Sequence, residues 1–120
     1  MATLYQLHSA MDTLSRSTEE MALTWRAGDS ILLLGTTVAF IEWLNAYLDE
    51  NQIQGIMGIY ALADDVAQLS PNTTAKLNLN AKLTALLTDS EWVKMTQNAN
   101  VNVNANVNEA NFDKVVTIAL

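Results

Sequence analysis

His8 is the only histidine in the chain, and imidazole is the side chain that exchanges a proton near neutral pH. Ser9 and Asp12 follow it closely, so a hydrolase that uses His8 as its base is one hypothesis. Neighbours in sequence do not by themselves form a catalytic triad, and the G-x-S-x-G turn that presents a nucleophilic serine is missing. We therefore interpret His8 as a structural or interface residue, and we predict no catalytic residue in this chain.

Asp64 and Asp65 form a carboxylate pair that could bind a metal ion. Helix capping is the simpler explanation, because Asp64 precedes a short helical pattern and aspartate is a preferred N-cap residue. A zinc site is disfavoured, since the sequence has no cysteine and a single histidine. A dinucleotide fingerprint needs several glycines at set spacing, whereas Gly35 stands alone after its apolar run. The sequence predicts neither a metal nor a cofactor.

The absence of cysteine also excludes disulfides and any persulfide or thioester chemistry on this chain. The formal net charge is −7, from thirteen acidic and six basic side chains. The basic residues are scattered singly, so direct binding of nucleic acid is not expected. No apolar run approaches the ~20 residues of a membrane span, and the first residues lack a signal-peptide pattern. We expect a cytoplasmic protein without a membrane partner.

The elements that must position these residues alternate between strand and helix patterns. Short apolar or alternating segments predict strands at 3–8, 30–35, 53–62, 83–87 and 114–119. Helices are predicted from the Ser17-x-x-Glu20 capping box to Gly28, over 36–51, from Asp64 to near Pro71, and from Thr88 to Met95. This order predicts a single α/β domain over 1–120, small, three-layered and doubly wound, with a mostly parallel five-stranded sheet.

An Asn-rich segment at about 98–111 interrupts this pattern with alternating Asn and Val or Ala. One interpretation is a surface excursion of low complexity between the last helix and the last strand. The other is an extra edge strand that pairs with a partner chain. The sequence leaves both open.

Aromatic residues lie along one edge of the helix predicted at 36–51. They are Phe40, Trp43 and Tyr47, and they widen its apolar arc beyond the ~100° stripe that faces a single core. We hypothesise that this edge contacts another subunit, because aromatic residues are enriched in interface cores. The alternative is that neighbouring loops cover it. Together with His8, these three residues are the candidate partner-contact residues.

Four segments in order resemble the TusB/DsrH family, the small subunits of sulfur-relay complexes. They are LYQLHSA at 4–10, GDSILLLGTTV at 28–38, IYALADDVA at 59–67 and TDSEWVKMT at 88–96. The resemblance covers most of residues 3–97 and treats the Asn-rich segment as an insertion. It implies a DsrEFH-like fold and assembly with TusC-like and TusD-like subunits.

In that family, persulfide sulfur passes from a TusA-like donor towards a TusE-like acceptor. The resemblance therefore implies a role in 2-thiolation of the tRNA wobble uridine or, as in DsrH relatives, in sulfur oxidation. It places the sulfur-carrying cysteine on the TusD-like partner, which agrees with a cysteine-free structural subunit that is not itself an enzyme. Such subunits can self-associate when isolated. The alternative from the residues alone is a stand-alone small-molecule or nucleotide-binding α/β domain.

Overall fold

A computed structural model describes residues 2–73, 78–97, 112 and 114–120. The Asn-rich segment at 98–111 lies outside these residues. The strands are β1 (Thr3–Leu7), β2 (Ser30–Leu33), β3 (Gly58–Leu62), β4 (Ala85–Leu87) and β5 (Lys114–Ile118). The helices are α1 (Met11–Ala22), the 3₁₀ helix η1 (Gly35–Phe40), α2 (Ile41–Glu50), α3 (Ala63–Ala67), α5 (Leu79–Lys82) and α6 (Asp89–Gln97).

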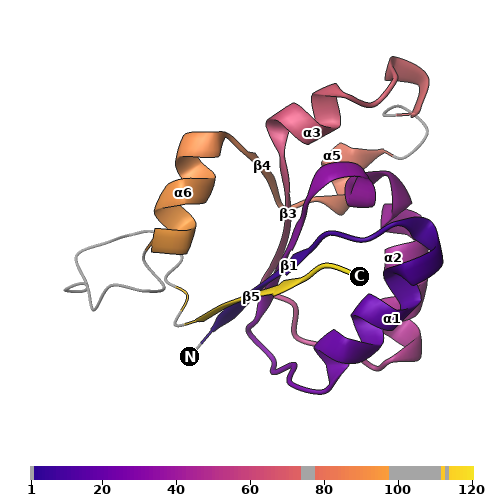
Figure 1. Cartoon of the computed structure of the whole chain (residues 1–120), viewed down its shortest axis with the longest axis vertical. Helices are drawn as coiled ribbons and strands as arrows, with labels where there is room; N and C mark the ends of the chain where they lie inside the picture. Colours follow the sequence, from indigo (N-terminus) through magenta and orange to yellow (C-terminus); the bar gives the residue numbers. More distant parts are fainter. Residues whose placement is uncertain (1, 74–77, 98–111, 113) are drawn as a thin grey trace.

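The strands form one five-stranded sheet in the order β4-β3-β2-β1-β5, and all four pairings are parallel. Helices α1 and α2 cover one face, and α6 lies against the other (Figure 1). This confirms the predicted α/β class, with a sheet that is parallel throughout the described strands. None of the helices in these ranges combines the length and apolar character that crossing a bilayer would require.

Alternation along the central strands divides the core between the two faces, because successive side chains of a strand point to opposite sides. Tyr5 and Leu7 belong to the larger cluster, which α1 and α2 complete. Leu4 belongs to the smaller cluster, which Trp92 and Met95 of α6 cover. A strand buried on both faces needs a continuous apolar run, which explains the composition of β2.

The chain reverses its direction across the sheet between β4 and β5. Strands β1 to β4 are laid down in one direction, and the chain then returns past β1 to add β5 at the opposite edge. Because parallel crossovers are right-handed, a connection that runs back across the sheet places its helix on the face opposite to α1 and α2. Helix α6 lies on that opposite face. The reversal creates a switch point between β1 and β5, where open parallel sheets commonly bind their ligands.

The first helix begins at Met11, six residues before the predicted capping box at Ser17, so that prediction is wrong. Ser17 is fully buried within α1, and its hydroxyl donates to the carbonyl of Thr13 at 3.2 Å. The hydroxyl is satisfied one turn back, as is common for serine inside a helix. The helix ends at Ala22, well before Gly28, which instead adopts a φ of +99° in the following turn.

The strand predicted at 53–62 begins only at Gly58. Gln52 and Gly55 have φ values of +56° and +70°, which extended strands do not use. A Cβ on Gly55 would lie 2.5 Å from the Cβ of Ala27, so this glycine permits a close approach of two loops. The predicted N-cap role of Asp64 is also wrong, because α3 already begins at Ala63 and has no side-chain cap.

The capping box predicted for the last helix is confirmed. The Thr88 amide donates to Glu91 Oε1 at 3.0 Å, and the Glu91 amide donates to Thr88 Oγ1 at 3.2 Å. These reciprocal bonds satisfy donors that a helix start would otherwise leave open. The donated hydrogen bonds from Thr88, with a smaller contribution from Lys94, hold the pKa of Glu91 below its ordinary value.

Candidate functional site

The carboxyl end of β1 carries His8 to the switch point beside β5. The His8 amide donates to the carbonyl of Ile118 at 3.0 Å, while the His8 side chain is exposed. The imidazole lies against Gly35, where an added Cβ would be 2.8 Å from Nε2. Gly35 has a φ of +59°, so both its conformation and its neighbour favour glycine.

The turn that follows β2 is closed by a carboxylate of the chain itself. Asp65 Oδ2 accepts a hydrogen bond from the Gly35 amide at 2.8 Å. Gly35 is the first residue of η1, so its N–H points out of the helix start. The Asp65 carboxylate occupies the position in which an anionic ligand would accept from this N–H. The neighbouring Asp64 is exposed. The two aspartates therefore differ in role, and Asp65 caps η1 rather than its own helix.

Ser9, the residue after His8, makes structural hydrogen bonds with its side chain and its backbone. Ser9 is 3 % exposed, and its hydroxyl hydrogen-bonds the buried hydroxyl of Ser17. Its amide donates to Thr37 Oγ1 at 2.9 Å, and Thr37 Oγ1 donates back to the Ser9 carbonyl at 3.1 Å. These bonds tie the β1–α1 loop to α1 and η1. The serine and histidine that a hydrolase would need are thus directed to different partners.

The aromatic edge of α2 is partly open to solvent. Trp43 is 56 % exposed, whereas Phe40 and Tyr47 are half-buried and pack against the larger core cluster. Nearby, Lys82 Nζ of α5 lies 2.9 Å from Glu42 Oε1 and joins α5 to α2. Described loops therefore leave Trp43 uncovered. His8 follows β1 and lies against Gly35 at the start of η1, whereas Trp43 and Tyr47 lie on α2, the helix after η1.

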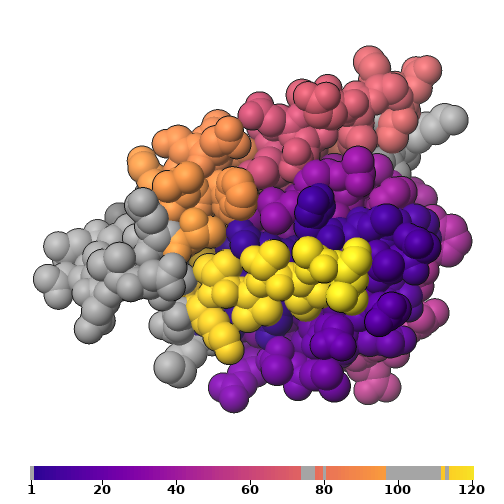
Figure 2. All heavy atoms as spheres, viewed as in Figure 1, coloured from indigo at the N-terminus to yellow at the C-terminus, as the bar shows by residue number. Residues whose placement is uncertain are grey.

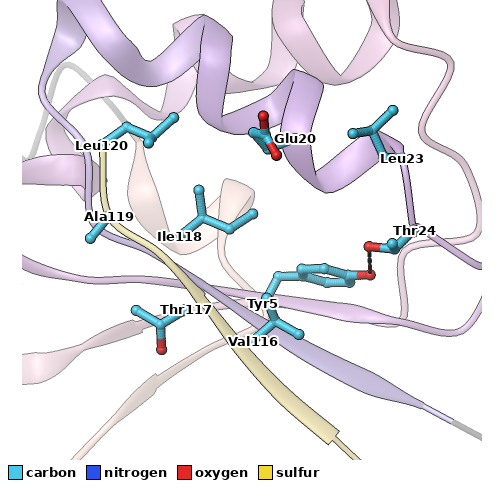
Figure 3. A pocket seen from close by; sticks show the side chains of 9 residues that line it. All are labelled: Tyr5, Glu20, Leu23, Thr24, Val116, Thr117, Ile118, Ala119 and Leu120. Atoms are coloured by element: carbon cyan, nitrogen blue, oxygen red, sulfur yellow. Dashed lines mark hydrogen bonds between the residues drawn. The ribbon is translucent and has the colours of Figure 1, made fainter.

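A groove runs between α1 and β5, with a volume of about 440 Å³ (Figure 3). The side chains of Leu120, Glu20 and Leu23 follow one another along its upper border, and Val116, Ile118 and Tyr5 lie below them. Leu23 is 79 % exposed and Leu120 is 46 % exposed. Strand β5 and the residues after it, in yellow, lie open along the visible surface in Figure 2.

This groove is not among the sites predicted from the sequence. Its local signals were present, since Leu23 is a large apolar residue at a helix end and 114–119 is rich in β-branched residues. What the sequence could not predict is that β5 takes an edge position beside α1, because strand order depends on contacts far apart in the chain.

Within the ranges that the structure describes, no cluster of three or more His, Asp or Glu residues has a geometry that could hold a metal ion. No known protein family, curated protein or solved structure matches this chain. The candidate features that the structure provides are the exposed aromatic edge of α2, the His8–Gly35–Asp65 turn and the groove along β5.

Proposed function

We propose that the chain is a non-catalytic structural subunit of a sulfur-relay complex of the TusB/DsrH type. The observation that carries the proposal is the lack of any cysteine in a chain whose segments follow the TusB/DsrH order. A cysteine-free subunit cannot hold a persulfide, so the sulfur-carrying thiolate belongs to a TusD-like partner. The all-parallel α/β sheet is compatible with the DsrEFH-like fold that the resemblance implies.

The arrangement around His8 supports a role without catalysis. The Ser9 hydroxyl is buried against Ser17, and the Asp65 carboxylate is bound to the Gly35 amide. A general base must reach the proton it removes, and a nucleophile must reach its substrate. The Ser9 hydroxyl is bonded to Ser17 and is therefore not available as a nucleophile beside His8.

The aromatic edge of α2 supports a role in assembly. Trp43 exposes 56 % of its surface, next to Phe40 and Tyr47, which hold their part of the edge against the core. Tryptophan and tyrosine are enriched among the residues that contribute most to protein interfaces. We propose that this edge contacts a TusC-like or TusD-like subunit.

Within this proposal, the complex serves 2-thiolation of the tRNA wobble uridine, and sulfur oxidation by a DsrEFH-like system is its alternative. Deleting the gene and measuring 2-thiouridine in digested tRNA by mass spectrometry separates the two pathways. We expect the modification to fall and to return when the gene is restored. Unchanged 2-thiouridine in the deletion strain would exclude the thiolation pathway.

The same strain tests the aromatic edge. Trp43→Lys places a charge in the proposed interface, whereas Asn45→Lys adds the same charge to an exposed position on the same helix. We expect Trp43→Lys to fail to restore 2-thiouridine and Asn45→Lys to restore it. Equal restoration by both variants would remove the edge of α2 from the proposed interface.

The second candidate is a stand-alone small-molecule-binding domain, and the groove along β5 is the observation in its favour. Its volume of about 440 Å³ lies within the ~300–1,000 Å³ of small-molecule sites. Its border is largely apolar, with Glu20 between leucines. The chain purified with a bound small molecule and without partner proteins would favour this candidate.

A further inference from the structure

The groove along β5 has the features of a site for an added strand. We propose that it binds an extended segment of a basic partner protein, which pairs with the edge of β5. The segment would carry the pattern apolar-x-basic-x-apolar on the side that faces α1. This inference deepens the proposed function, on which it rests, by naming a second contact surface and the chemistry of its partner.

Strand β5 has an outward hydrogen-bonding edge with which no described strand pairs. The carbonyl of Ile118 accepts from the His8 amide, so Ile118 directs its backbone groups towards β1. Because these groups alternate along a strand, Thr117 directs its N–H and C=O away from the sheet. Strand β5 is the last in the order of the described strands, so no described strand pairs with that edge.

Among the described residues of β5, charge protection of this edge is confined to Lys114 at the first position. Exposed edge strands commonly carry charges, proline or bulges that prevent pairing with other chains. On β5, Lys114 at the first position is followed by Val115, Val116, Thr117 and Ile118, which are uncharged. The strand therefore resembles edges to which extended peptides are added.

The side chains above this edge form a row with a charged group between two apolar ones. Leu120 and Leu23 lie at the two ends of the groove, and Glu20 lies between them (Figure 3). Among the described lining residues, Glu20 is the charged one, and its exposed carboxylate has no ion-pair partner in the described ranges. Every second side chain of an added strand would face this row.

The negative charge of the chain favours a basic partner. The chain has a formal net charge of −7, so a second copy would be repelled and a basic protein attracted. A lysine or arginine between two apolar residues would place its charge beside Glu20 and its apolar neighbours against Leu23 and Leu120. The edge of β5 would supply backbone hydrogen bonds to the same segment.

The test uses the purified full chain and a short fluorescent peptide, Val-Thr-Lys-Thr-Val, with fluorescence anisotropy as the readout. Thr117→Pro removes the outward N–H, which edge strands tolerate, whereas Thr117→Val keeps it. Both variants lose the hydroxyl that accepts from Gln6 Nε2 at 2.8 Å, so they differ in the backbone N–H. We expect Thr117→Val to bind like the wild type and Thr117→Pro to bind at least ~10-fold more weakly. Equal affinities of these two variants would overturn the proposal.

Two neighbouring glutamates provide the matched test of charge. Glu20→Gln is expected to weaken binding ~3-fold, as an exposed ion pair does, while Glu19→Gln on the same helix leaves it unchanged. An equal loss in both variants would show attraction by net charge alone and overturn the assigned site. If Thr117→Pro does not fold, N-methylation of the peptide amides replaces it. Affinity that survives this methylation would also overturn strand addition.

Two further outcomes separate this inference from the proposed function. If the native relay complex assembles equally with wild-type and Thr117→Pro chains, the groove proposal fails and the structural-subunit proposal stands. If the peptide binds as expected but no relay partners associate with the chain, the groove proposal stands and the sulfur-relay function fails. A dimer of the chain that Thr117→Pro abolishes would assign the edge to a second copy and overturn the basic partner.

Discussion

Asp29 offers a direct measure of how much one buried carboxylate contributes to this fold. The residue is 2 % exposed, and its two oxygens accept separate backbone hydrogen bonds. Oδ1 accepts from the Thr3 amide at 2.9 Å, and Oδ2 accepts from the Arg26 amide at 2.9 Å. The carboxylate therefore joins the start of β1 to the turn before β2.

Asparagine at position 29 keeps the size of the side chain but replaces one acceptor oxygen with an NH₂ donor. One of the two backbone N–H groups, of Thr3 or Arg26, then faces another donor. Hydrogen bonds to charged groups contribute ~1.5–3 kcal/mol, and a buried donor without a partner costs ~1–3 kcal/mol. We expect Asp29→Asn to lower the free energy of unfolding by about 3 kcal/mol, a large part of the ~5–15 kcal/mol of a typical domain.

Urea unfolding, followed by circular dichroism, measures this loss as a lower midpoint with an unchanged slope. Asp49→Asn makes the same chemical change at an exposed position on α2 and is expected to stay within ~0.5 kcal/mol of the wild type. An effect of Asp29→Asn as small as that of Asp49→Asn would refute the assignment of Asp29 as a buried clamp.

Three further predictions concern separate parts of the fold. Gly55→Ala should cost about 3 kcal/mol by urea unfolding, because it combines a positive φ with a 2.5 Å clash. Gly28→Ala should cost only about 1 kcal/mol, since nothing lies within 4 Å of its added Cβ; equal costs would contradict this steric argument. Trp92→Phe removes the indole N–H that donates to Gln6 Oε1 at 2.7 Å and should cost about 1–2 kcal/mol by the same assay, and an unchanged midpoint would count against this bond. Because the pKa of Glu91 is lowered from 4.5, its carboxylate stabilises the fold above pH 4.5, and this contribution is lost as pH falls through the lower folded-state pKa. The difference in urea midpoint between the wild type and Glu91→Gln should therefore shrink in acid, and a constant difference would argue against the capping role.

Local patterns were sufficient to predict the fold class. The apolar run of β2 and the β-branched residues of β5 are properties of short segments, and the alternation of strands and helices then restricts the connections. The capping box at Thr88 and Glu91 was predictable for the same reason, since both partners lie within one turn.

The same motif failed at Ser17 and Glu20 because capping depends on where a helix begins. Ser17 is buried in α1 and bonded to Ser9 and to the Thr13 carbonyl, contacts that require the loop after β1 to be in place. The prediction of a strand from residue 53 failed because Gly55 meets Ala27 in another loop. These contacts join distant residues, so the periodicity of a short segment does not reveal them.

In the candidate site too, some features follow from local sequence patterns and others depend on contacts between distant residues. Exposure of Trp43 agrees with an apolar arc wider than one core needs, although its contact with a partner remains a proposal. The bond from the Gly35 amide to Asp65 and the groove between Glu20 and β5 depend on the strand order. The pairing of β5 with β1 joins residues that are far apart in the chain, so no local sequence pattern predicts it.

The most direct test of the structural-subunit proposal is to purify the tagged chain from its native cells and identify the associated proteins by mass spectrometry. The proposal predicts two small α/β proteins in stoichiometric amounts, at least one of them with the cysteine that this chain lacks. Recovery of the chain alone, or only as a homo-oligomer, would contradict a role in a sulfur-relay complex.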